Sequence, residues 1–131
     1  MKHYKYTYEA IDVTTDDGIV LTMFHVTGHD SDYKQYERNE TPVLVMHGAF
    51  LDGSSWQDIY LPGFGELPHT PLPLHLWQMK FDVWVGNQRG TQYGNPDNLD
   101  TPEFWNNQTL PVHALDIQAM IRGIQEATGK S

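Results

Sequence analysis

The segment "VLVMHGAF", Val43–Phe50, decides the expected fold. Its apolar beginning has no alternation with polar residues, which is typical of a parallel strand buried on both faces. His47-Gly48 ends the run and "LDGSSW" follows, so the strand is expected to stop in an abrupt turn. A glycine at a strand end often marks close approach of the backbone to another group, and parallel strands place ligands at their carboxyl ends. The segment therefore predicts an α/β protein with a site just after this strand.

Composition limits the size of the protein and its class of partner. The 131 residues have room for one domain, residues 1–131, and 39% of them are hydrophobic. There are 17 acidic and 8 basic residues, a formal net charge of -9, which argues against binding to nucleic acid or to an anionic membrane surface. With no cysteine, disulfides and thiolate metal sites are excluded. The start "MKHYKYTYEA" resembles no signal peptide and no run reaches transmembrane length, so an intracellular chain is expected.

The first half of the chain predicts a hairpin. Tyr6–Val13 and Ile19–Val26 are rich in residues that favour strands, and "TTDDG" separates them. Asp17-Gly18 is expected to supply a turn with positive φ between two antiparallel strands.

Further elements follow the hairpin. Pro42–His47 is expected to be the third strand, and Ser54 or Ser55 to cap a short helix that runs through Tyr60. The Pro- and Gly-rich stretch 61–74 and the stretch 89–102 are expected to be irregular. The remaining elements are a helix over 74–80, a strand over 81–87 and a helix over 111–130. Strands alternating with helices after a hairpin indicate α/β crossovers.

The last helix has apolar residues at helical spacing. The cluster expected on one side consists of Val112, Leu115, Ala119, Ile121 or Arg122, and Ile124. Pro111 suits the first turn of this helix, and Gly129 suits the position just after its end.

Three motifs that would indicate a cofactor or a metal fail. "TGKS" at the end of the chain would need a glycine where Ile124 stands, with a strand before it. "GFGELP" lacks the third glycine and the helix of a dinucleotide-binding turn. The seven histidines show no HExxH or other ligand spacing. Neither a cofactor nor a metal site is expected.

Several stretches together carry a more specific pattern. The hairpin "VTTDDGIVLTMFHV", the dipeptide His47-Gly48 and the pair Ser55-Trp56 are followed by "FDVWVGNQRGTQYG" at 81–94. Phe104-Trp105 and Asp116 continue the series. These stretches resemble the acid lipases, the α/β-hydrolases that include gastric and lysosomal acid lipases and sterol-ester hydrolases. The resemblance runs from about Tyr8 to Gly129, and the "DVW-GN-RG" segment is its most specific part.

The resemblance implies a fold and a site. The fold would be an incomplete α/β-hydrolase core, with the hairpin, the first parallel strands and the helices, but without the nucleophile strand. Ala49, the residue after His47-Gly48, would supply a backbone N–H of the oxyanion hole. The supporting loop would contain His47, Gly48, Asn87 and Arg89. The chain departs from the family at Ile19, His25 and Gln118, and in the Pro-rich stretch 61–74, which leaves substrate shape open.

Arg89 carries a separate expectation. It follows the strand that begins at Asp82, in the turn "GNQRG". Arginine is seldom buried without a partner, and its guanidinium pairs well with carboxylates. We therefore expect Arg89 to be partly buried and bonded to backbone carbonyls or a carboxylate.

The catalytic serine of α/β-hydrolases lies in G-x-S-x-G, with an acid and a histidine later in the chain. None of the serines, Ser31, Ser54, Ser55 and Ser131, has that frame. The chain alone is expected not to hydrolyse esters. One hypothesis is the N-terminal portion of a lipid or sterol ester hydrolase, completed by a second chain. The alternative is a non-catalytic structural or interaction subunit that retains half of a hydrolase fold.

Both hypotheses imply a protein partner. In the family the third strand lies beside the nucleophile strand, and without that neighbour its apolar edge would be unpaired. An uncovered apolar edge favours aggregation. A second chain is therefore expected to cover the third strand, with a lipid ester as substrate if the assembly is active.

Overall fold

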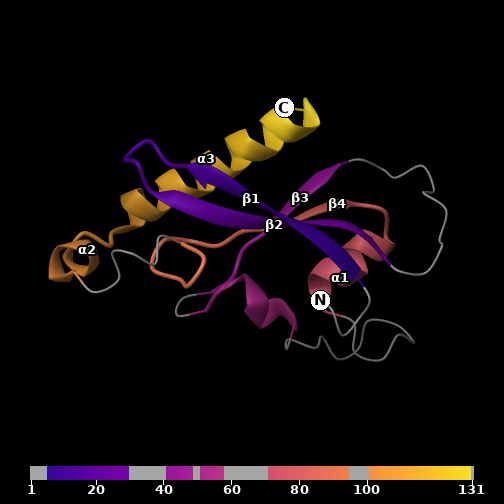
Figure 1. Ribbon diagram of the computed structural model, residues 1–131, viewed down its shortest axis with the longest axis horizontal. Helices are drawn as coiled ribbons and strands as arrows, with labels where there is room; N and C mark the ends of the chain where they lie inside the picture. Colours follow the sequence, from indigo (N-terminus) through magenta and orange to yellow (C-terminus); the bar gives the residue numbers. More distant parts are fainter. Residues whose placement is uncertain (1–5, 30–40, 49–50, 58–70, 95–100, 131) are drawn as a thin grey trace.

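The computed structural model of the protein describes residues 6–29, 41–48, 51–57, 71–94 and 101–130. Four strands and four helical segments lie within them (Figure 1). In chain order they are β1 (Tyr6–Thr14), β2 (Val20–His29), β3 (Pro42–Val45), the 3₁₀ helix η2 (Gly53–Gln57), α1 (Leu72–Gln78), β4 (Asp82–Val85), α2 (Pro102–Asn106) and α3 (Leu110–Thr128). None of the helices in these ranges is both long and apolar enough to span a membrane.

The four strands form one mixed sheet in the order β1-β2-β4-β3. β1 pairs with β2, and β2 with β4, in antiparallel fashion. β3 and β4 are parallel, from Pro42 opposite Asp82 to Val45 opposite Val85. Their carboxyl ends therefore meet at one end of the sheet, and β3 is the last strand on its side of the described sheet.

The expected hairpin is confirmed, with one correction at its turn. Thr14 pairs with Val20, and the Gly18 amide donates to the Thr15 carbonyl at 2.9 Å. Gly18 has φ 86°, whereas Asp17 has no positive φ, so one residue and not two adopts the left-handed conformation. The Thr15 N–H also donates to the Ile19 carbonyl at 2.8 Å, which leaves a three-residue loop, 16–18, with glycine at its last position.

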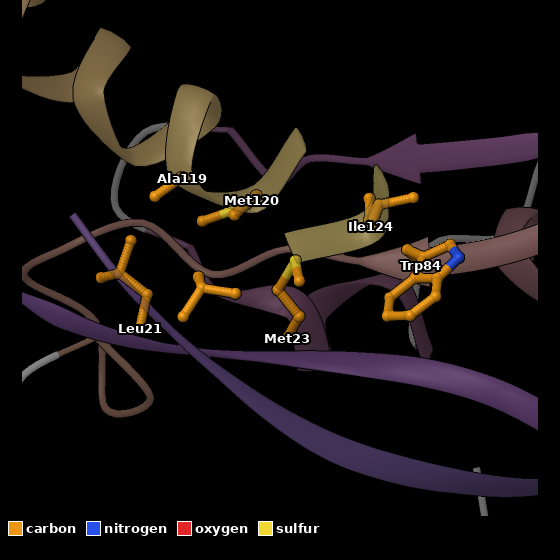
Figure 2. Packing of buried hydrophobic residues seen from close by; sticks show 7 residues of the cluster. Leu21, Met23, Trp84, Ala119, Met120 and Ile124 are labelled. Carbon is orange, nitrogen blue, oxygen red and sulfur yellow. The ribbon is translucent and has the colours of Figure 1, made fainter. Parts of the chain in front are cut away.

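Helices cover both faces of the sheet, and alternate residues of β4 divide between them. Trp84 belongs to the core under α3, together with Leu21 and Met23 from β2. Figure 2 shows these side chains pointing toward Ala119, Met120 and Ile124 of α3. The neighbouring Val83 faces the opposite way, into a second core with Val45 and Leu74. β4 is therefore buried on both faces, as a parallel strand inside a sheet should be. The third strand, β3, for which this burial was expected, has only Val45 buried, and its other three residues are partly buried.

α3 confirms the expected last helix but not all of its expected face. Pro111 lies in the first turn and Gly129 ends the helix in the left-handed conformation, as predicted. The fully buried residues are Asp116, Ala119, Met120 and Ile124, whereas Ile121 is 45% exposed. The expected cluster omitted Asp116, because an apolar pattern gives no reason to bury a carboxylate, and it also missed the apolar Met120.

Four further expectations need correction. β3 ends at Val45, two residues before His47. α1 begins at Leu72, inside the stretch expected to be irregular, because a proline is tolerated in a first helical turn. α2, which begins at Pro102, was not expected. The short helix after the third strand begins at Gly53, and the part of it expected through Tyr60 lies outside the described residues.

Candidate functional site

The turn after β3 is tied to the loop after β4 through His47, whose side chain is buried. The Gln88 backbone N–H donates to His47 Nε2 at 3.1 Å. The other ring nitrogen, Nδ1, lies 2.8 Å from the Gly48 carbonyl oxygen. A backbone N–H can only donate, so Nε2 must be the acceptor and Nδ1 carries the hydrogen. One neutral tautomer therefore satisfies both contacts.

Asn87 ties the far end of the same turn. It is 0% exposed, and its Oδ1 accepts the Gly53 N–H at 2.7 Å. Its Nδ2 donates to the Thr22 carbonyl of β2, also at 2.7 Å. A side chain at Gly53 would meet Val85 and Asn87 at about 3 Å, so glycine allows this close approach. The turn from His47 to Gly53 is thus held at both ends by residues that follow β4.

Asp52 directly precedes η2 and caps it, which corrects the expectation that a serine caps this helix. Its Oδ1 accepts the Ser54 N–H at 2.7 Å, and its carbonyl accepts the Ser55 N–H and hydroxyl. Gln92 Nε2 donates to the other carboxylate oxygen at 2.8 Å. Burial tends to raise the pKa of Asp52, but the hydrogen bonds from Ser54 and Gln92 outweigh it and lower the pKa. The carboxylate is therefore held in its charged form beside the turn.

The loop after β4 folds back against β2. The Tyr93 carbonyl accepts the Thr22 N–H at 3.0 Å, and Gly90 donates to Gly94 at 3.1 Å. A Cβ atom at Gly94 would lie 2.1 Å from the Gln88 carbonyl oxygen. Only glycine fits at that position, which explains the second glycine of the "RGTQYG" segment.

Three segments meet at the Arg89 cluster, which consists of Arg89, Asp17 and Asp116. Nη1 and Nη2 of Arg89 donate to the two oxygens of Asp17 at 2.6 and 3.0 Å. Nε donates to Asp116 Oδ1 at 2.8 Å, and the Arg89 backbone N–H donates to Asp116 Oδ2 at 2.9 Å. The expectation that Arg89 is partly buried and bonded to a carboxylate is confirmed. The cluster joins the hairpin turn, the loop after β4 and α3.

The charges of the Arg89 cluster stabilise one another. Burial by itself would lower the pKa of Arg89, but its hydrogen bonds to Asp17 and Asp116 outweigh burial and raise the pKa. The hydrogen bond from Arg89 lowers the pKa of Asp17 from 3.8 to about 2.

The His25 cluster joins β1, β2 and β4 farther from the turn, and it consists of His25, Glu9, Asp82 and Trp84. The His25 ring nitrogens lie 2.8 Å from Glu9 and 2.6 Å from Asp82. The ring stacks on Trp84 at 4.0 Å, and Trp84 Nε1 donates to Asp82 Oδ2. His25 stands where the resemblance places an arginine, and it retains contacts with carboxylates on both neighbouring strands.

The predicted site residues divide into two groups. His47, Gly48, Asn87 and Arg89 all lie at the carboxyl ends of β3 and β4. Ala49 lies outside the described residues, so its expected role stays a prediction.

Sequence reasoning missed two groups that hold the site, Asp52 and the backbone N–H of Gln88. Asp52 had a signal, since aspartate is one of the residues preferred just before the first turn of a helix. Gln88 contributes through its backbone, which leaves no trace in the residue type. Within the described ranges, no three His, Cys, Asp or Glu side chains gather as metal ligands would.

Comparison with known proteins gives matches along nearly the whole chain. Residues 1–58 match the family described as the partial alpha/beta-hydrolase lipase region. Triacylglycerol lipase 2 of Arabidopsis thaliana is 33% identical over 97% of this chain and 30% of its own length. Lipase member M of Mus musculus is 30% identical over 99% of this chain, again 30% of its own length. Gastric triacylglycerol lipase of Rattus norvegicus is 24% identical over 98% of the chain and 31% of its length.

A solved structure gives the same fold. An esterase of Pyrococcus furiosus superposes with a TM-score of 0.57 at 12% identity, covering 98% of this chain and 39% of the esterase. The fold is therefore part of an α/β-hydrolase core, as expected. The chain spans about a third of the length of the curated relatives named above.

Proposed function

We propose that the chain supplies the oxyanion side of an enzyme that hydrolyses carboxylic esters of lipids, since its residues 1–58 match the partial alpha/beta-hydrolase lipase region. The observation that carries the proposal is the turn after β3, tied to the loop after β4 through His47 and Asn87. Residues outside these 131 would supply the nucleophile, the acid and the catalytic histidine, since no G-x-S-x-G is present here.

The proposed role of the turn is to stabilise negative charge. The residue after His47-Gly48 is Ala49, whose backbone N–H would donate to the oxygen of the tetrahedral intermediate. A donor held in advance costs no reorganisation during the reaction, and removal of one such donor typically lowers kcat by about 10²–10³-fold. The ties at His47 and Gly53, on either side of Ala49, support this role because they join the described ends of the turn to residues that follow β4.

The proposal includes a neighbour for β3. The Thr41 carbonyl accepts the Asp82 N–H at 3.1 Å, and the Val45 carbonyl accepts the N–H of Gly86, just after β4, at 3.0 Å. The main-chain groups of Thr41 and Val45 therefore face β4. The main-chain groups of Leu44 then face the other way, where the described sheet has no strand. We expect a strand outside these 131 residues to pair there, and in an active enzyme this strand would lead to the nucleophile.

The test uses the chain alone and a chimera. In the lipase chimera, residues 1–131 replace the matching 30% of triacylglycerol lipase 2 of Arabidopsis thaliana. We expect no ester hydrolysis by residues 1–131 alone, and turnover of short- and long-chain esters by the chimera. A folded chimera without turnover would favour the alternative, a non-catalytic subunit.

Substitutions of Ala49 in the chimera test the oxyanion role most directly. Ala49→Pro removes the backbone N–H and is expected to lower kcat about 10²-fold or more. Ala49→Gly keeps the N–H and serves as the matched control, with a much smaller loss. Equal kcat values for the two variants, with both folded by circular dichroism, would contradict the oxyanion role.

A further inference from the structure

We infer that His47 is a positioning residue, whose ring fixes the direction of the amide that follows Gly48. The inference rests on the proposed function, since that amide belongs to Ala49. His47 would not touch the substrate. It would act through the one peptide unit that joins Gly48 to the next residue.

The ring of His47 is oriented from both sides. Nε2 accepts the Gln88 N–H at 3.1 Å, which leaves Nδ1 to donate to the Gly48 carbonyl at 2.8 Å. The ring is buried, and its residue is only 8% exposed. The other tautomer would bring two donors together at Gln88 and two acceptors together at Gly48. A ring flipped by 180° would point carbon atoms at both groups.

The covalent geometry of the peptide unit links the direction of the Gly48 carbonyl to the direction of the next N–H. In a planar trans peptide the C=O and the following N–H point in opposite directions. A side chain that holds the Gly48 carbonyl therefore also sets where the next N–H points. Glycine has the widest choice of backbone conformation, so Gly48 by itself would allow this peptide unit to rotate. The Nδ1 contact of His47 at 2.8 Å opposes that rotation, and a longer bond from the Leu51 N–H at 3.3 Å acts on the same carbonyl.

The second contact of His47, with the Gln88 N–H, orients the ring relative to β4. Gln88 follows β4, and the neighbouring Asn87 holds Gly53 at the other end of the turn. The peptide unit after Gly48 is thus oriented relative to β4 and not only relative to its own strand. An oxyanion donor must be placed to within a fraction of an ångström, because small misplacements cost about 10²-fold in rate.

Two substitutions separate the two ring nitrogens. In His47→Asn the side-chain amide can still donate to the Gly48 carbonyl, but the acceptor for Gln88 is lost. In His47→Gln the side-chain carbonyl can still accept from Gln88, but the donor to Gly48 is lost. Each variant loses one hydrogen bond, so a merely structural role predicts similar losses of stability and activity.

The experiment measures kcat and KM of both variants in the lipase chimera with a soluble short-chain ester. We expect His47→Gln to lower kcat about tenfold to a hundredfold with KM nearly unchanged. We expect His47→Asn to lose at least tenfold less, although both unfold at similar temperatures. Nitrogen NMR of the histidine-labelled chimera should show the hydrogen of His47 on Nδ1.

Equal kcat losses in the two variants, or a hydrogen on Nε2 of His47, would overturn the inference while the chimera remains active. A folded but inactive parent chimera would instead overturn the proposed function, and the inference with it. If the full replacement does not fold, a smaller graft of residues 42–57 and 82–94 contains both contacts of His47 and gives the same comparison.

Discussion

The Arg89 cluster and the His25 cluster both join nitrogen groups to carboxylates from distant segments, but they differ in burial. The side chains of Arg89 and Asp116 are 4% and 0% exposed. Those of His25 and Asp82 are 20% and 16% exposed, and Glu9 is 55% exposed. A charge that loses its partner in the interior cannot recover its water, whereas one near the surface can. Loss of a charged partner should therefore lower the free energy of unfolding more in the Arg89 cluster than in the His25 cluster.

The largest effect is expected for Arg89→Met. This change leaves the carboxylate of Asp116 buried, with the backbone N–H of residue 89 as its remaining donor from that residue. Breaking a buried pair in this way typically costs about 3–5 kcal/mol of unfolding free energy. Urea denaturation of the lipase chimera measures the loss. The matched control is Arg122→Met, because Arg122 pairs with Asp16 at the surface and its loss should cost about 0–1 kcal/mol.

A double variant sharpens this result. Arg89→Met with Asp116→Leu removes both buried charges and should recover part of the lost stability, because a buried ion pair can often be replaced by apolar residues. Equal stabilities of the Arg89→Met and Arg122→Met variants would show that burial does not determine how much these ion pairs contribute to the free energy of unfolding.

A smaller effect is expected for His25→Phe. The new ring can still stack on Trp84, but the contacts with Glu9 and Asp82 are lost. Because Asp82 keeps its hydrogen bond from Trp84 and Glu9 faces water, the expected cost is about 1–2 kcal/mol. His25→Arg, which restores the residue type of the family pattern, should cost less than His25→Phe. A loss as large as that of Arg89→Met would contradict the comparison.

The smallest effect concerns acid stability and Asp17, whose side chain is 38% exposed. The hydrogen bond from Arg89 lowers the pKa of Asp17 to about 2, so the folded state favours the carboxylate. The resulting stability is fully present above about pH 5 and is lost as pH falls through 3.8 toward 2. Asp17→Asn should therefore be less stable than the parent chimera at pH 5, with a difference that shrinks as pH falls. A constant difference between pH 5 and pH 2 in urea midpoints would contradict this.

The proposed site was only partly accessible from the sequence. His47, Gly48, Asn87 and Arg89 could be named because their residue types recur in a specific pattern. The hydrogen bonds of these residues could not be predicted. Gln88, for example, acts through its backbone N–H, so its residue type gives no signal. Asp17 was recognised as a turn residue, yet it also pairs with an arginine 72 positions away. Local signals report local structure, and such long-range pairs appear only when the elements pack.

The sequence by itself determined the elements whose causes are local. The apolar run that begins at Val43 predicted a strand, and Asp17-Gly18 predicted a hairpin turn. Tertiary structure decided which polar residues are buried. Asp116 lies on the buried face of α3, where an apolar residue would be expected. It is stable there because Arg89 donates a hydrogen bond to it and the two charges compensate each other. It also decided the tautomer of His47, since that depends on a carbonyl and an amide brought together only by the parallel pairing of β3 and β4.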